Sequence, residues 1–343
     1  MKLVRTAAAL AVAAGSTVAL ALPAAAAAPS ETIYAVTSGG NRFIVFSSSS
    51  PSTAGNGTAI TGLSGAPGEL VVGIDVRAAT NVLYALTDDN NHLGRLYTLD
   101  PTTAVATPVS PGTTVDLTDT AANAKFDIDF NPCADRLRVV DSNGLNIRIN
   151  QLTGGLAGTD TTLSYPSGDT NAGSSPAIAG IGYTSAVTTV SGGTTSCATT
   201  LYDADFIANS LARQGSVGGT PTSPNTGQLA TVGPFGVDPN SVLGFDISGA
   251  TGTAYLAAQI NSSRGLTSPQ TLLYSVDLSS GTATPAQMSN NVGSDILGSI
   301  AVAPASTTPT ASLPELPAAA LAPLAGIAVL GGAALVRRRR SRV

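Results

Sequence analysis

Short apolar runs of strand length recur along most of the chain, separated by turn residues. Residues 71–109 hold four of them, at 71–76, 82–87, 93–99 and 105–109. Each run is rich in β-branched residues, Leu or Tyr and is bounded by Asn, Asp, Gly, Pro or Thr. Such runs are typical of strands joined by tight turns. The stretch therefore predicts one antiparallel sheet of four strands.

This four-run unit recurs about every 50 residues between Thr32 and Pro304, a period typical of repeat folds. The first runs of the units align as Gly73-Ile74-Asp75-Val76, Asp127-Ile128-Asp129-Phe130, Gly180-Ile181-Gly182-Tyr183, Gly244-Phe245-Asp246-Ile247 and Ser299-Ile300-Ala301-Val302. No further runs follow the last of these. The chain instead begins with three runs that lack a first strand, at 32–37, 42–47 and 57–62.

A ring of sheets closes securely when one sheet takes strands from both ends of the chain, because no free edge then remains. Residues 298–303 would supply the innermost strand of the blade that the first three runs begin. The sequence thus predicts an all-β fold, a β-propeller of five four-stranded blades closed by strands from both termini. A β-sandwich or a solenoid of the same units is the alternative.

The two ends of the chain differ from the repeats. Residues 1–28 have Lys2 and Arg5, an apolar core and a run of alanines, and this pattern predicts a secretory signal peptide cleaved near Ala27. An N-terminal membrane helix is the alternative. The propeller would then occupy residues 29–304, and the protein would be exported.

The C-terminal end has the features of a membrane anchor. A Thr/Pro/Ser linker at 305–317 leads to the uncharged apolar segment 318–336, and the basic tail 337–343 follows. These features predict a transmembrane segment with a cytoplasmic Arg tail, and hence display at the cell surface. Leu313-Pro314-Glu315-Leu316-Pro317 is similar to the start of a sortase signal but lacks its Thr-Gly. We therefore favour a retained anchor over sortase attachment.

The net charge of the predicted domain limits the classes of partner that it can bind. The 9 Lys and Arg and 20 Asp and Glu of residues 29–304 give a formal charge of −11. An acidic body with scattered bases argues against nucleic-acid binding, which needs a basic face. It is compatible with cation binding. We expect a monomer with an unidentified surface or extracellular ligand.

Three aspartates occupy the third position of the aligned first runs. They are Asp75, Asp129 and Asp246, with Gly182 and Ala301 at the equivalent positions of the other blades. Innermost strands line the channel of a propeller, so these carboxylates would face one axial cavity. Carboxylate oxygens are the ligands that Ca²⁺ and other hard divalent cations prefer. The alternative is that the aspartates cap backbone amides or pair with arginines.

A second group of charges lies in the second complete unit. Alternation places Arg136 and Arg138 on one face of a strand. Arg148 lies on the next strand, and Asp127 and Asp129 share a face of the strand before. If these faces coincide, they form a charge-paired patch that would hold a carboxylate or a sugar acid. An ion-pair network between blades is the alternative.

The two cysteines of the chain, Cys133 and Cys197, both fall between the first and second strands of adjacent units. In an exported protein such a pair predicts a disulfide. A cysteine nucleophile would need a nearby base, and the only histidine, His92, lies in a turn.

Several motifs carry a family resemblance: Phe126-Asp127-Ile128-Asp129-Phe130-Asn131-Pro132, Asp135-Arg136-Leu137-Arg138-Val139-Val140, Gly144-Leu145-Asn146-Ile147-Arg148-Ile149-Asn150, Gly73-Ile74-Asp75, Gly233-Pro234-Phe235-Gly236-Val237-Asp238 and Gly244-Phe245-Asp246-Ile247. Over residues 33–304 the chain resembles the bacterial family of domain of unknown function 4394. It departs from the family pattern at Asp127-Ile128, where Gly-Phe is more usual. The resemblance implies an exported, propeller-like domain and supplies no catalytic residues.

The sequence has no Gly-x-Ser-x-Gly elbow, no Ser/His/Asp set and no Cys/His metal cluster. We therefore expect a binding or scaffold module on the cell surface rather than an enzyme. The alternative is a cation-dependent hydrolase or a lactonase-like propeller enzyme that uses the channel carboxylates. A structural envelope protein without a ligand is a third possibility.

Overall fold

The computed structural model describes residues 30–118, 124–260, 270–286, 292 and 296–305. The chain divides into two compact units, Met1–Pro304 and Ala305–Val343, and the described residues belong almost entirely to the first. The predicted signal peptide, most of the linker, the anchor and the basic tail lie outside the described residues. Within the described part, no helix is both long enough and apolar enough to span a bilayer.

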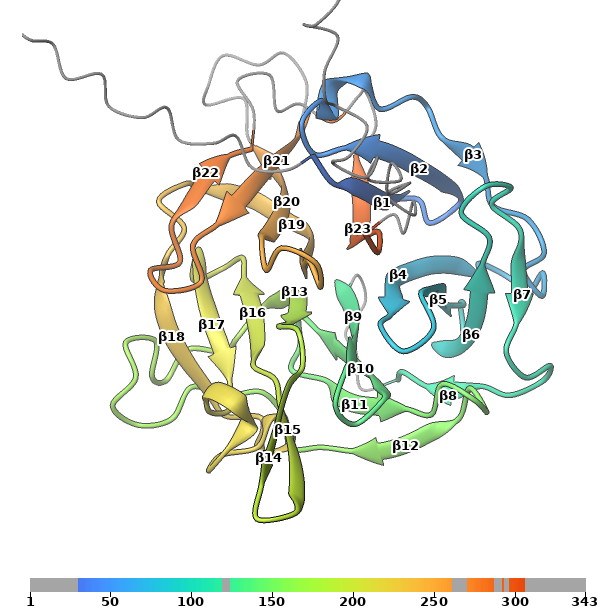
Figure 1. Ribbon diagram of the computed structural model, residues 1–343. Helices are drawn as coiled ribbons and strands as arrows, with labels where there is room; N and C mark the ends of the chain where they lie inside the picture. The colour runs from blue at the N-terminus through green and yellow to red at the C-terminus, as the bar shows by residue number, and fades with distance from the viewer. Residues whose placement is uncertain (1–29, 119–123, 261–269, 287–291, 293–295, 306–343) are drawn as a thin grey trace, which may run out of the picture. The chain divides into compact units, whose positions relative to one another are not determined.

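Five sheets of four strands or more form a ring in the described residues (Figure 1). The innermost strands are β4 (Leu70–Arg77), β9 (Phe126–Asn131), β13 (Ile178–Tyr183), β19 (Pro239–Ile247) and β23 (Leu297–Val302). Each of them contacts the innermost strands of both neighbouring sheets. These strands coincide with the five aligned first runs. The predicted five-bladed β-propeller is therefore confirmed.

The remaining strands lie outward from these five. In the first blade they are β1 (Thr32–Thr37), β2 (Arg42–Ser47) and β3 (Thr58–Ala59), and in the second β5 (Val82–Asp88), β6 (Leu93–Leu99), β7 (Ala106–Pro108) and β8 (Val115–Asp116). The third and fourth blades contain β10 (Arg136–Asp141), β11 (Asn146–Ile149), β12 (Leu156–Thr159), β16 (Leu201–Asp205), β17 (Ser210–Gln214) and β18 (Leu229–Pro234). The fifth contains β20 (Ala254–Ile260), β21 (Gln270–Val276) and β22 (Ala283–Pro285). Short 3₁₀ turns are η1 (Pro51–Thr53), η2 (Val217–Gly219) and η3 (Pro224–Thr226).

Strands from both ends of the domain close the ring, as predicted. The last strand, β23, pairs antiparallel with the first, β1, with Ile33 opposite Val302 and Ala35 opposite Ile300. Ile33, Ala35 and Ile300 are buried and pack against residues of the fifth blade. The pairing leaves no open inner edge at the junction.

A repeated turn explains why so many runs end in Asp or Asn. The Asp100 carboxylate accepts hydrogen bonds from the Thr102 and Thr103 amides, and Ala104 then adopts a φ of 57°. The Asn131 side chain likewise accepts from the Cys133 and Ala134 amides. Short polar side chains that bond the backbone two residues later favour such turns over a continued strand.

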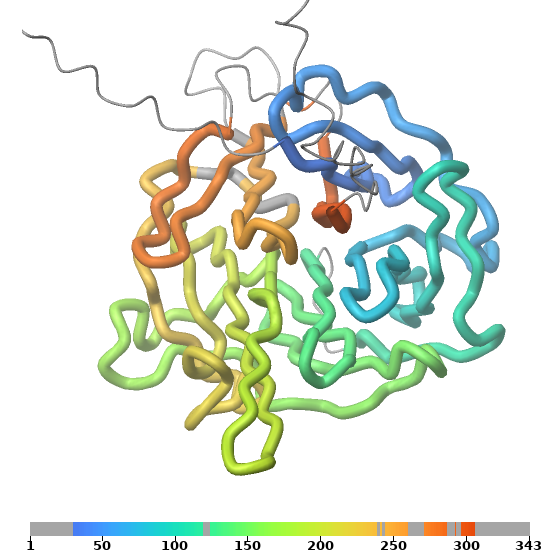
Figure 2. Tube along the Cα trace, in the orientation of Figure 1, coloured from blue at the N-terminus to red at the C-terminus, as the bar shows by residue number. Residues whose placement is uncertain are grey.

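One element was not predicted from the sequence. A hairpin of β14 (Val187–Ser191) and β15 (Thr194–Ala198) is inserted between the first two strands of the fourth blade. It extends from the centre of the ring past its rim (Figure 2). The disulfide between Cys133 and Cys197, with Cα atoms 5.6 Å apart, joins this hairpin to the third blade and confirms the predicted pairing.

Gly244 on β19 provides a test of ring closure. Its φ is 132°, and a Cβ atom there would lie 2.6 Å from the Ile300 amide nitrogen of β23. We predict that Gly244→Ala lowers the free energy of unfolding by about 2 kcal/mol or more, because backbone strain and the clash add. The expected fall in melting temperature is about 4–8 °C. Differential scanning calorimetry measures it.

Gly55→Ala is the matched control, because nothing lies within 4 Å of a Cβ at that exposed position. It should leave the melting temperature unchanged. Equal effects of the two substitutions would contradict this account of the closure.

Candidate cation site on the propeller axis

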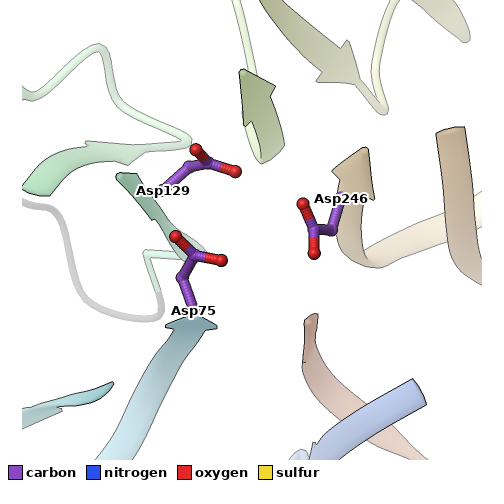
Figure 3. Close-up of side chains that lie close together, drawn as sticks. All are labelled: Asp75, Asp129 and Asp246. Carbon is purple, nitrogen blue, oxygen red and sulfur yellow. The ribbon is translucent and has the colours of Figure 1, made fainter. Parts of the chain in front are cut away.

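Three carboxylates from three blades meet on the axis (Figure 3). Asp75 of β4, Asp129 of β9 and Asp246 of β19 are only 5–6% exposed, and one oxygen of each lies within 4.8 Å of the others. They come together because all three occupy the same position of an inner strand, and inner strands are equivalent around the ring. Gly182 and Ala301 occupy this position in the other two blades.

The same carboxylates also cap backbone amides of the neighbouring blade. Asp75 accepts from the Phe130 amide of β9 at 2.7 Å, and Asp246 accepts from the Val302 amide of β23 at 2.5 Å. Adjacent inner strands belong to different sheets, so these N–H groups have no ladder partner. A buried amide needs a partner, and the aspartates supply it. The amide-capping alternative drawn from the sequence is therefore observed.

Asp127 and Ser299 form a second layer, two residues earlier on their strands. Asp127 is 1% exposed, and its carboxylate accepts from the Ile181 amide of β13 at 2.9 Å and from the Ser299 hydroxyl at 3.2 Å. The Ser299 hydroxyl in turn accepts from the Ile74 amide of β4. We call Asp75, Asp127, Asp129, Asp246 and Ser299 the axial ring.

The sequence had singled out Asp127 but not Ser299. The signal was present, because both residues occupy the first position of their aligned runs. Between β13 and β19 the strands pack directly against each other, without an Asp or Ser at the first position of the β13 run to bridge them. A Cβ at Gly182 would lie 2.9 Å from the Ile247 side chain, so glycine allows these two strands to pack closely.

In the axial ring, burial and charge repulsion disfavour the ionised carboxylates, whereas the hydrogen bonds favour them. Burial raises the pKa of Asp75, Asp127 and Asp129 well above the usual range, and the neighbouring carboxylates raise it further. Burial likewise raises the pKa of Asp246 to about 6. The amide hydrogen bonds favour the ionised form and act in the opposite direction. In the described residues, none of these four carboxylates forms an ion pair with Lys, Arg or His.

A divalent cation fits this arrangement. Ca²⁺ binds oxygen ligands at about 2.3–2.6 Å, so two of its ligands can lie as far as about 5 Å apart. The 4.8 Å limit on the three aspartate oxygens matches that span. Mg²⁺ dehydrates reluctantly and usually keeps several of its waters, whereas Ca²⁺ takes more of its ligands from protein oxygens, so the buried carboxylates favour Ca²⁺.

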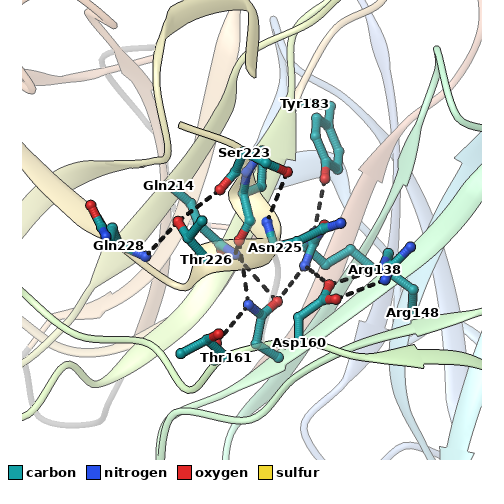
Figure 4. Close-up of polar contacts among 12 residues, drawn as sticks. Arg138, Arg148, Asp160, Thr161, Tyr183, Gln214, Ser223, Asn225, Thr226 and Gln228 are labelled. Carbon is teal, nitrogen blue, oxygen red and sulfur yellow. Dashed lines mark hydrogen bonds and ion pairs between the residues drawn. The ribbon is translucent and has the colours of Figure 1, made fainter. Parts of the chain in front are cut away.

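The predicted arginine patch has a different partner from the one expected (Figure 4). Arg138 is 2% exposed and pairs with Asp160 at 3.0 Å, while Arg148 pairs with the same carboxylate at 2.8 Å. Asp127 and Asp129 pair with neither arginine. The sequence reasoning missed Asp160, which lies just past the outer strand of the blade.

Arg138 has few donors left for a ligand. Its guanidinium also donates to the Tyr183 hydroxyl at 2.8 Å and to Asn225 at 2.6 Å, and it contacts Asn146. Tyr183 and Asn225 belong to the fourth blade. The ion pairs therefore lie within the third blade, the hydrogen bonds of Arg138 join it to the fourth, and the cluster is a structural network rather than an open ligand site.

The other predicted charges lie nearer the surface. Arg136 donates to the Asp135 carbonyl and to the Gln151 side chain. Arg77 forms a bidentate pair with Asp135, which joins the second and third blades. The His92 imidazole lies 3.4 Å from Asp88 in its turn and is 40% exposed.

One buried carboxyl beside the network has no partner. Asp203 of β16 is fully buried, and neither of its oxygens accepts a hydrogen bond from the described residues. Burial raises its pKa well above the usual range, although the Arg138 charge lowers it. Asp203 is therefore a cost to the folded state wherever it must ionise.

Asp203→Asn tests this assignment through pH. A raised pKa in the folded state means that wild-type stability is lost as pH rises above about 4, the unfolded value. We predict that Asp203→Asn is more stable than wild type by about 1–3 kcal/mol at pH 8. The difference should shrink as the pH falls and vanish below about pH 3, where the carboxyl is protonated in both states. Urea unfolding at a series of pH values measures it, with exposed Asp238→Asn as control. A gain that does not depend on pH would contradict the assignment.

The model of a known family matches residues 42–298, which include four of the five inner strands and the first two residues of the fifth, β23. The chain belongs to the family described as Domain of unknown function (DUF4394). This confirms the resemblance drawn from its motifs. None of the curated proteins matches this DUF4394 member.

Solved structures similar to this DUF4394 chain share little sequence with it. A protein of unknown function from Bacteroides thetaiotaomicron is 13% identical, with a TM-score of 0.45, and the match covers 80% of this chain and 64% of that one. An exo-1,5-α-L-arabinanase from a bovine ruminal metagenomic library is 11% identical, with a TM-score of 0.39 and coverage of 74% and 93%. An exo-β-1,3-galactanase from Phanerochaete chrysosporium is 11% identical, with a TM-score of 0.36 and coverage of 71% and 60%. The match spans less than two thirds of the first and third of these proteins.

Proposed function

We propose that this DUF4394 protein is an exported binding module of the cell surface whose propeller holds a divalent cation, Ca²⁺, on its axis. The observation that carries the proposal is the convergence of Asp75, Asp129 and Asp246 within 4.8 Å in a buried channel. The ion stabilises the inner strands, and the blades form the scaffold that presents the binding surface.

The charges of the axial ring favour a bound ion. The amide hydrogen bonds hold Asp75 and Asp246 in the geometry of ionised carboxylates. Burial and mutual repulsion oppose that ionisation. A cation at the centre resolves the conflict, because it neutralises the carboxylates without breaking their bonds to the amides.

The disulfide favours an exported protein. Cys133–Cys197 is a bond that persists in oxidising compartments and is rare in the cytosol. Two sequence features support the same location at the cell surface. They are the signal-peptide pattern at the N-terminus and the apolar segment 318–336.

A cation-dependent hydrolase is the second candidate, because the three aspartates keep a small exposure to solvent. An ion with only three protein ligands would have positions left for water and for a substrate carbonyl oxygen, which the ion would polarise as a Lewis acid. Hydrolysis of simple lactones or aryl esters that depends on Ca²⁺ and is lost in Asp129→Asn would favour this candidate over the binding module.

The cation predicts a stability that depends on Ca²⁺. At about 100 times its dissociation constant, an ion that binds only the folded state adds about 2.7 kcal/mol. We predict that millimolar Ca²⁺ raises the melting temperature of EDTA-treated protein by about 5–10 °C. Asp129→Asn should remove the response, since it deletes one ligand charge and keeps the side-chain shape. Exposed Asp238→Asn should keep it. A melting temperature that changes with neither EDTA nor Ca²⁺ would overturn the cation proposal.

Export and membrane anchoring are tested in a separate experiment. We predict that the mature protein begins near residue 28 and stays in the membrane fraction, because the signal peptide is cleaved and residues 318–336 anchor the chain. A chain ended after residue 310 should appear in the medium with the Cys133–Cys197 disulfide formed. Mass spectrometry of the fractions gives both results. An uncleaved chain in the cytosol would contradict the proposed export.

A further inference from the structure

The interface between the third and fourth blades is polar at positions where the other blades are apolar. Asp203 of β16 lies opposite Ile181 of the inner strand, and the equivalent residues of the other four blades are Ala35, Ala85, Val139 and Leu256. All of these equivalents, like Asp203, are fully buried. A buried carboxyl therefore replaces an aliphatic side chain in one blade only.

Three more polar side chains belong to this interface. Gln214 of β17 lies opposite Leu201, where three other blades carry Phe46, Ile149 and Val276. Asn146 of β11 stands where the others carry Phe43, Leu96, Leu211 and Leu273. Arg138 stands where the others carry Tyr34, Tyr84, Tyr202 and Tyr255. Well-packed apolar residues are often as stabilising as buried charges, so packing alone does not explain this polar set.

Three acceptor atoms of the interface have no partner among the described residues. They are both carboxyl oxygens of Asp203 and Oε1 of Gln214. The Gln214 amide is fixed in orientation, because its Nε2 donates to the Pro224 carbonyl at 2.7 Å and to Asn146 Oδ1 at 3.2 Å (Figure 4). Turning the amide would point an oxygen at two acceptors. A buried acceptor needs a donor, and here the donor must come from outside the network.

The side chain opposite Asp203 is small. Ala212 of β17 pairs with Asp203, whereas the equivalent residues of the other blades are Ile44, Tyr97, Ile147 and Tyr274. The pair of Asp203 and Ala212 has the smallest volume of the five. A buried water needs space and two to four polar partners. The smallest pair thus coincides with the unpartnered acceptors.

The charges of the interface favour water over a cation. Arg138 and Arg148 share one carboxylate, Asp160, which leaves one positive charge in the network. An ionised Asp203 balances that charge, and an added cation would unbalance it. The Arg138 charge lowers the pKa of Asp203, yet no ion pair of the described residues joins the two. Water commonly bridges polar groups that lie close but do not touch.

We propose that Asp203 and Gln214 bind an ordered water between the third and fourth blades. The water donates one hydrogen to the Asp203 carboxylate and the other to Gln214 Oε1. Its oxygen accepts from Arg138, whose Nη2 has a hydrogen beyond the one donated to Asn225. Buried waters typically make about three such bonds. The water lessens the cost of ionising Asp203 without removing it, and it does not depend on the axial cation.

A high-resolution crystal structure of the full chain tests the water directly. We expect a density peak about 2.7–3.2 Å from oxygens of Asp203 and Gln214. Asp203→Val should lose the peak, because it copies Val139 of the third blade and offers no acceptor. Asp203→Asn is the matched control and should keep it. Direct contact between Asp203 and Gln214, with no density between them, would overturn the proposal.

Two further measurements separate water from its alternatives. Deuteron relaxation dispersion detects long-lived internal waters in solution, and the wild type and Asp203→Asn should each show one more than Asp203→Val. Equal numbers in all three proteins would contradict the proposal. A wild-type crystal soaked in rubidium chloride should show no anomalous peak beside Asp203. A rubidium peak there would assign a monovalent cation to the site and overturn the water.

Discussion

The hydrogen bonds that cross from one inner strand to the next hold the centre of this propeller together. Neighbouring blades share no β-ladder at the axis, so the amides that face the adjacent blade need partners from side chains. Asp75, Asp127 and Asp246 each accept from the next inner strand, and Ser299 accepts from β4. Carboxylate and hydroxyl side chains on one inner strand are long enough to reach the amides of the next.

The chemistry of the axis follows from that structural task. A carboxylate caps an amide better than a neutral group does, but several carboxylates in one buried channel repel each other and lose their hydration. Burial and repulsion raise the pKa of Asp75 and Asp129 for this reason. In our proposal a cation balances the charge, so the residues that join the blades also form the ligand site. The same side chains thereby link ring closure, stability and cation binding.

The sequence predicted those features that repeat. Aligning the five first runs placed Asp75, Asp129 and Asp246 at one level of the ring, and the unmatched runs at the two ends predicted the pairing of β1 with β23. Apart from Ser299, the features it missed do not repeat. Asp160 follows the outer strand β12 of the blade that also holds Arg138, at a position that the repeat does not mark. The β14–β15 hairpin is an insertion into one unit, and its Thr- and Ser-rich sequence has no apolar face that would mark it as strands.

The measurement that tests the central claim most directly is a crystal structure of the protein grown with Ca²⁺, with anomalous data collected to locate the ion. The account predicts an anomalous peak on the propeller axis about 2.3–2.6 Å from one oxygen each of Asp75, Asp129 and Asp246. Density for water alone between the three carboxylates, with no anomalous peak at saturating Ca²⁺, would contradict it. The axial ring would then be held by shared protons and amide hydrogen bonds.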